Sequence, residues 1–168
     1  MRQWQLPRRR ECRDWCIVPI MFVAGAFALR DFVLDDQFER THRRADVFRH
    51  GPVVIVAGAQ RKTPDAMQAW DHALRSLVPE GTRVLGLSNL KRLPFFVPKS
   101  AVRNNLAAQL PDTPVLMDWK GRLYPELGFP AGATVSVGVF GPTGERLGII
   151  TGEPTEPRLA AVAELLFP

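Results

Sequence analysis

The stretch PVVIVAGAQRKTPDA at residues 52–66 decides the fold class. It opens with an unbroken apolar run rich in β-branched side chains, which is typical of a strand buried on both faces. It ends as the start of a helix, because Thr63 can cap the helix, Pro64 suits its first turn and Asp65 complements its dipole. The stretch therefore predicts a buried strand, a short loop and a helix.

Strand and helix patterns continue to alternate on both sides of this stretch. In chain order we expect an extended run at 32–34, a strand at 84–87, a helix capped by Ser100, a strand at 115–117, a short helical piece ending at Leu127, a hairpin of strands 135–139 and 147–150, and a last helix capped by Thr155. This alternation predicts an α/β fold with a mainly parallel centre and helices on both faces. The hairpin should add antiparallel strands at one edge.

The first 28 residues have the three parts of an export signal. A basic region at residues 8–10 precedes an apolar run over residues 16–27, and small residues at Ala26 and Ala28 suit cleavage. The apolar run is shorter than the roughly 20 residues that cross a bilayer. A cleaved signal is the first interpretation, and an uncleaved membrane anchor at residues 16–28 is the second. A true start at or near Met21 is the third.

The domain organisation follows from this leader. Residues 1–28 are expected to be the export signal or membrane anchor, and residues 29–168 to be one folded domain in the periplasm or cell envelope. The net charge of +5 does not indicate a nucleic-acid partner, because a net of +3 lies within residues 1–28. The membrane is expected to be contacted only through the N-terminal segment.

The distribution of cysteine limits the chemistry. Cys12 and Cys16 are the only cysteines, and both lie in the leader. The domain therefore has no internal disulfide, no thiolate nucleophile and no cysteine metal site. The three histidines and the acidic residues near position 36 show no metal-ligand spacing, so no metal and no cofactor are expected. We expect surface histidines and a solvated acidic turn from these residues: His42, His50, His72, Asp35, Asp36 and Glu39.

The order of elements resembles the thioredoxin fold in its longer redoxin and peroxiredoxin form. Residues 46–56, 114–129 and 135–152 carry the likeness, which covers about residues 30–166. It implies a three-layer sandwich, in which a central mixed sheet has helices on both faces and ends in a β-hairpin plus helix. A closer likeness is to exported proteins of the YtfJ type, at residues 96–103 and 117–121. The function of that family is unsettled, so the likeness implies location and fold.

The active-site position departs from the pattern that this resemblance implies. Peroxiredoxins carry P-x-x-x-T-x-x-C after the first central strand, and the matching segment keeps Thr63 but has Ala59 for proline and Ala66 for the peroxidatic cysteine. The C-x-x-C of thioredoxins is absent as well. The position of their cis-proline corresponds to Ala133 before Thr134. Thr63 fits the family motif, although a helix cap alone explains it.

Two functions remain open on these grounds. The first is a non-catalytic binding or scaffold protein, with no catalytic residue and an unknown protein or peptide partner in the envelope. The alternative is a thiol-dependent oxidoreductase or antioxidant of the redoxin class. It requires Cys12 and Cys16 to stay attached and reach the domain, or a reaction that uses no thiol.

Two groups of residues are candidate contacts. Gln60, Arg61 and Lys62 lie with Thr63 just before a helix, where free N–H groups favour an anion or acidic peptide. The alternative is a pair of solvated charges. A partner patch is expected from Phe95, Phe96 and Trp119. The alternative there is that the phenylalanine rings pack against the sheet edge and the indole covers the core.

Overall fold

The computed structural model describes residues 29–59 and 63–167. The expected leader with both cysteines, and Gln60, Arg61 and Lys62, lie outside the described residues.

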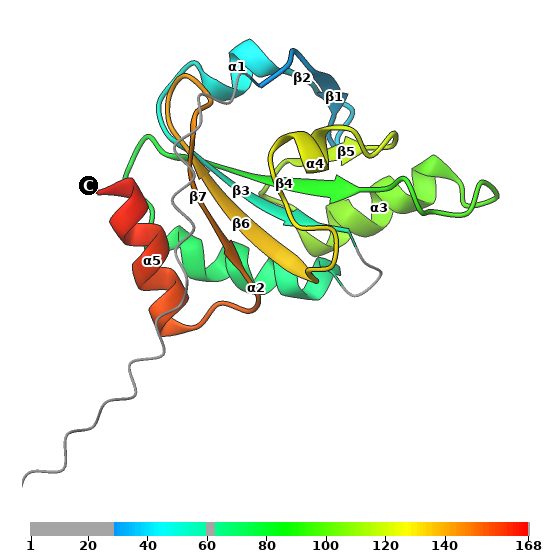
Figure 1. The fold of residues 1–168 in the computed structure, drawn as a ribbon. Coiled ribbons are helices and arrows are strands. Elements are labelled where there is room, and N and C mark those ends of the chain that lie inside the picture. The colour runs from blue at the N-terminus through cyan, green and yellow to red at the C-terminus, as the bar shows by residue number, and fades with distance from the viewer. Residues whose placement is uncertain (1–28, 60–62, 168) are drawn as a thin grey trace, which may run out of the picture.

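A five-stranded mixed sheet forms the centre of the molecule, with the strand order β5-β4-β3-β6-β7 (Figure 1). The central β3 pairs parallel to β4 on one side and antiparallel to β6 on the other. The prediction that the hairpin adds antiparallel strands at one edge is therefore confirmed, with β6 beside β3 and β7 at the edge of the sheet. The strands are β3 (Val53–Gly58), β4 (Arg83–Asn89), β5 (Val115–Asp118), β6 (Val135–Phe140) and β7 (Arg146–Thr151).

Helices cover both faces of the sheet, as the sequence predicts. The face of Val54 and Val56 packs against α2 (Thr63–Arg75), α3 (Lys99–Gln109) and α5 (Glu156–Leu166). The face of Val53 and Ile55 packs against α1 (Arg44–Phe48) and α4 (Leu123–Glu126). Successive residues of a strand point to opposite faces, so a strand covered on both sides must be apolar throughout.

A small hairpin of β1 (Val33–Asp35) and β2 (Thr41–Arg43) leads into α1 and lies beyond β5 (Figure 1). The sequence predicts the first strand but neither β2 nor α1. Strand β2 reads Thr-His-Arg, and its middle residue alone is buried. A segment this polar and short carries no alternating apolar signal.

Three expected helix caps differ in detail. Helix α3 begins at Lys99 with Pro98 at its N-cap, so Ser100 lies inside the helix and does not cap it. Thr155 occupies the N-cap of α5, but its side chain makes no capping hydrogen bond. Helix α2 begins at Thr63 itself. Among the helices of the described residues, none combines the length and the apolarity needed to cross a membrane.

Candidate functional site

The corner that corresponds to the thioredoxin active site lies where β3 ends and α2 begins. Thr63, the first residue of α2, is buried, and its hydroxyl donates a hydrogen bond of 3.1 Å to the carbonyl oxygen of Thr134. Thr134 directly precedes β6. The expectation that Thr63 caps α2 from outside is therefore corrected, since its hydroxyl ties the helix start to the segment before β6.

The backbone at this corner is closely packed. A β-carbon on Gly58 would lie 1.5 Å from the methyl carbon of Thr63, so only glycine fits at the end of β3. The threonine methyl fills the space that a larger side chain at position 58 would need. The corner is therefore shaped by a glycine and threonine pair that the sequence pattern alone does not reveal.

The position that the resemblance assigns to the peroxidatic cysteine holds a buried methyl group. Ala66 is 6% exposed and packs in the apolar cluster that contains Met67 and Trp70. A methyl group has no lone pair with which to attack a peroxide or a disulfide, whereas thiol chemistry needs a thiolate. Among residues 29–59 and 63–167 no peptide bond is cis, and neither Ala133 nor Thr134 is a proline. The described residues of the corner that the resemblance matches to the redox site therefore carry no thiol.

Three adjoining clefts surround the carboxyl end of β4. The first, of about 710 Å³, and the second, of about 330 Å³, share Ala59, Asn89 and Arg92. The third, of about 270 Å³, reaches Thr63 and shares Leu93 with the first. Ligands of α/β proteins bind beyond the carboxyl ends of parallel strands, where loops leave room for them. The clefts are therefore the candidate binding site.

The loop after β4 presents two phenylalanine rings to solvent. Phe95 is 99% exposed and Phe96 is 73% exposed, and their centroids lie 5.9 Å apart in an edge-to-face arrangement. The alternative that these rings pack against the sheet edge is therefore wrong. The loop extends past the carboxyl end of β4, at the right of Figure 1.

Trp119 lies apart from these rings. It follows β5, is half-buried and has the ammonium of Lys99 at 5.2 Å from its ring centroid. It lines a cleft of about 830 Å³ with residues of the N-terminal segment, and it does not line the cleft that Phe96 lines. The structure thus brings Phe95 and Phe96 together, and it places Trp119 on a different cleft.

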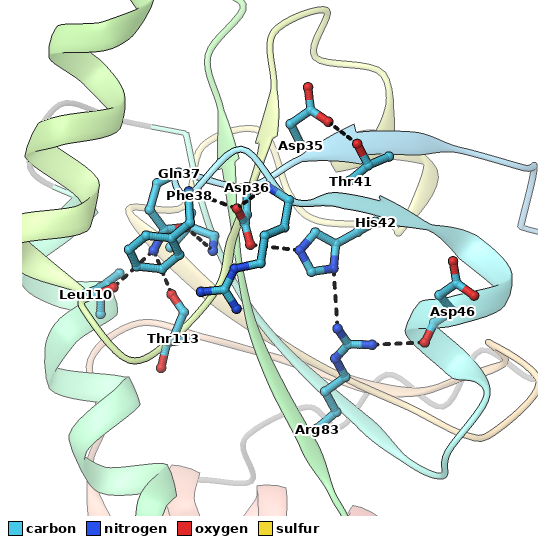
Figure 2. Close-up of polar contacts among 12 residues, drawn as sticks. Asp35, Asp36, Gln37, Phe38, Thr41, His42, Asp46, Arg83, Leu110 and Thr113 are labelled. Atoms are coloured by element: carbon cyan, nitrogen blue, oxygen red, sulfur yellow. Dashed lines mark hydrogen bonds and ion pairs between the residues drawn. The ribbon is translucent and has the colours of Figure 1, made fainter.

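A buried polar network occupies the opposite end of the parallel strands (Figure 2). Asp36 is fully buried, and its carboxylate accepts hydrogen bonds from the backbone N–H groups of Phe38 at 2.8 Å and Arg40 at 3.0 Å. The Nε2 atom of His42 lies 2.9 Å from Asp36 Oδ2, and Arg83 Nη2 lies 3.3 Å from His42 Nδ1. The guanidinium can only donate, so Nδ1 accepts and the ring proton sits on Nε2.

The prediction of a solvated acidic turn and surface histidines is therefore wrong for Asp36 and His42. Both side chains are buried, because each has a hydrogen-bond partner that compensates for lost hydration. His50 and His72 are exposed, as expected. Groups of three or more histidine, cysteine or acidic side chains with metal-binding geometry do not occur within the described ranges.

Gln37 extends the same network to the start of β5. Its amide nitrogen donates to the carbonyl oxygens of Leu110 at 3.0 Å and Thr113 at 2.9 Å, and its amide oxygen accepts the N–H of Val115 at 2.7 Å. The partners lie more than 70 residues along the chain. We name Asp36, Gln37, His42 and Arg83 the hairpin network. Sequence reasoning missed it, because its contacts span separate elements.

At the carboxyl end of β5, Asp118 shapes one wall of the site. Its buried carboxylate accepts the N–H groups of Arg122, Leu123 and Tyr124, which begin α4. Tyr124 in turn lines the second cleft. Burial raises the pKa of the Tyr124 phenol above its ordinary value.

Comparison with known proteins shows the fold but no sequence family. No protein-family model matches the chain, and no curated protein matches it. The pneumococcal exposed lipoprotein thioredoxin Etrx1 of Streptococcus pneumoniae superposes with a TM-score of 0.62 at 16% identity, covering 80% of this chain and 98% of its own. Peroxidoxin BcpB of Mycobacterium tuberculosis gives 0.57 at 19% identity, covering 82% and 92%.

A thiol-disulfide oxidoreductase of Bacteroides fragilis superposes with a TM-score of 0.58 at 13% identity, covering 83% of this chain and 98% of its own. Each of these structures spans most of the described domain. Identities this low show shared architecture only. The chain therefore has the thioredoxin-like α/β fold.

Proposed function

We propose that the chain is an exported, thiol-independent binding protein of the cell envelope, built on a thioredoxin-like domain. The observation that carries the proposal is that Ala66, which stands where the resemblance places the reactive cysteine, is a buried methyl group. From residue 29 onward the chain contains no cysteine, so no thiol elsewhere in the domain could take the place of the reactive cysteine. Without a thiolate, the corner can still bind a ligand through the shape of its surface.

The clefts around β4 favour an extended peptide segment as the ligand. Ala59, Leu93 and Phe96 give the first cleft apolar walls, and Asn89 and Arg92 place an amide and a guanidinium at its junction with the second. Mostly apolar walls with a few polar groups are typical of binding sites, because the walls supply affinity and the polar groups fix orientation. Arg92 favours a peptide that carries a carboxylate.

The proposed anion contact at Gln60, Arg61 and Lys62 stays a prediction, since these residues lie outside the described part of the chain. The envelope location is supported by the signal-like leader and by the exposed lipoprotein among the superposed structures. The YtfJ-type likeness stays a prediction on which the comparisons do not bear.

A thiol-dependent oxidoreductase is the competing function, and the names of several superposed proteins favour it. In this chain it would have to use Cys12 or Cys16. Replacing both with serine separates the two functions, because binding would survive the change and thiol turnover would not.

The binding proposal can be tested by selecting peptides from a random library on the full chain. We expect enrichment of peptides with apolar residues beside a carboxylate, and we expect Arg92→Ala to weaken the selected peptide about tenfold. The matched control is Arg49→Ala, which removes an exposed arginine whose nearest carboxylate is Asp46 on α1. Equal affinity of the Arg92 variant and the unchanged chain would contradict the proposal.

A further inference from the structure

The loop between β4 and α3 is both apolar and basic. Phe95 at its tip lines none of the three clefts, whereas Phe96 also lines the first cleft. Phe95 and Phe96 at the tip are 99% and 73% exposed, and Leu93 beside them is 38% exposed. Soluble proteins rarely present adjacent aromatic rings to water unless a partner covers them. Pro94 and Pro98 flank the rings and restrict the backbone, so presenting them costs little conformational entropy.

The charges on this loop are all of one sign. Lys91, Arg92 and Lys99 are exposed, and among the described residues no carboxylate lies within ion-pair distance of them. The sequence has no aspartate or glutamate anywhere from residue 81 to residue 111. The surface that covers the loop should therefore be negatively charged over a wide area.

The shape of the loop distinguishes between negatively charged surfaces. A protein partner usually receives aromatic anchors in a pocket and gives a matching contact back, whereas this loop projects beyond the sheet (Figure 1), and Phe95 at its tip lines no cleft. Convex apolar tips with basic side chains around them suit the boundary between lipid head groups and acyl chains. The rings can enter the acyl region while the cations stay with the phosphates.

We propose that residues 91–99 form a membrane-docking loop that inserts Phe95 and Phe96 into the surface of an anionic lipid bilayer. Lys91, Arg92 and Lys99 contact the lipid phosphates around the inserted rings. This contact is separate from residues 1–28 and adds a second attachment point, on the domain itself. It would hold the clefts at the carboxyl end of β4 next to the membrane surface.

The proposal is tested with vesicles of phosphatidylglycerol and phosphatidylcholine in equal parts, with vesicles of phosphatidylcholine alone for comparison. All proteins are full chains, so any contribution from residues 1–28 is common to them. We expect Phe95→Ser with Phe96→Ser to lower partitioning onto the anionic vesicles about tenfold or more. Phe167→Ser is the matched control, because Phe167 is also exposed and lies at the far end of α5.

The basic side chains of the loop allow a second test of the proposal. Replacing Lys91, Arg92 and Lys99 with glutamine should lower partitioning about tenfold on anionic vesicles and leave binding to phosphatidylcholine unchanged. Added salt should reduce the binding of the unchanged chain toward that of this variant.

Insertion itself is read from brominated lipids, which quench a tryptophan only at close range. Phe96→Trp should add quenching on anionic vesicles above that of the unchanged chain, and Phe167→Trp should add none. No added quenching at position 96, or equal partitioning of the serine variant and the unchanged chain, would overturn the proposal. A dimer without lipid that the serine variant converts to a monomer would also overturn it, since the rings would then join two copies of the chain.

Discussion

The two ends of strand β4 have opposite character. At its amino end, Arg83 belongs to the hairpin network, in which a fully buried carboxylate and a buried histidine satisfy one another (Figure 2). At its carboxyl end, Asn89 opens onto clefts and onto a loop with two exposed phenylalanine rings. Polar groups are thus buried at one end, and apolar groups are exposed at the other.

This difference teaches where stability and recognition lie in the molecule. Buried polar groups that are fully paired fix one arrangement of the chain, but they are costly to break. Exposed rings add nothing to folding and are available to a partner. Substitutions at the amino end should therefore lower stability, and substitutions at the loop should change binding alone.

The largest effect is expected at Asp36. Asp36→Ala removes the acceptor of two partly buried backbone N–H groups and of the buried His42 ring, and leaves these donors without it. We expect a loss of about 3 kcal/mol in the free energy of unfolding, measured by urea denaturation. The control is Asp35→Ala next to it, which is exposed and should cost less than about 1 kcal/mol. Equal costs at the two aspartates would remove the basis of the comparison.

A smaller loss is expected at the carboxyl end of β3, where the candidate corner is closely packed. Gly58→Ala would push a β-carbon into the Thr63 methyl and should cost about 2 kcal/mol. Adding Thr63→Ser removes that methyl and should recover roughly half of the loss, as a double-mutant cycle would show.

Gly132→Ala is the matched control for that experiment, because a β-carbon there meets no atom within 4 Å. Its unfolding free energy should stay within about 0.5 kcal/mol of the unchanged chain. If serine at position 63 gave no recovery, the packing of the corner would differ from the one described.

The expected effect of pH on the free energy of unfolding, through Tyr124, is smaller than these losses. Burial raises the pKa of Tyr124 above 10.0, so the folded state holds the phenol proton more tightly than the unfolded state does. The folded state then binds more protons, and stability is complete below the unfolded pKa and declines as the pH rises through the folded one. Tyr124→Phe should reduce this decline above about pH 10. The prediction would be contradicted if the unfolding free energy, measured by urea denaturation, fell with alkaline pH as steeply in the variant as in the unchanged chain.

The smallest effect on stability is expected at the exposed rings. Phe95→Ser with Phe96→Ser should leave the unfolding free energy within about 0.5 kcal/mol of the unchanged chain, because neither ring is buried in the fold. A loss above about 1 kcal/mol would show that the rings pack against the domain. The same variant is the one that should lose vesicle binding, which separates recognition from folding.

The sequence predicts a feature of this structure when the residues that form the feature are close together in the chain. The run at residues 52–57 predicts β3 because burial on both faces leaves an unbroken apolar pattern, and each end of the observed strand lies one residue later. The alanine at position 66, where the resemblance implies a cysteine, is also a local signal, since it is read from one short motif. The hairpin network could not be predicted in this way. Its contact from Gln37 to Val115 joins residues 78 positions apart in the chain. The identity of one polar residue in a sequence does not show whether its side chain is buried.

The loop at residues 91–99 illustrates the same limit at the site. Its composition allowed the rings either to pack on the sheet edge or to face solvent, and only the path of the chain decides between them. The clefts likewise depend on the ends of β3 and β4 meeting α2, α3 and α4, which no motif describes.

The central claim is that this thioredoxin-like corner performs no thiol chemistry. Its most direct test is to measure hydroperoxide consumption and insulin disulfide reduction by the full chain and by the variant with Cys12→Ser and Cys16→Ser. The account predicts that both proteins turn over no faster than a heat-denatured sample. Turnover by the unchanged chain that disappears in the serine variant would contradict it, and so would turnover that persists in both.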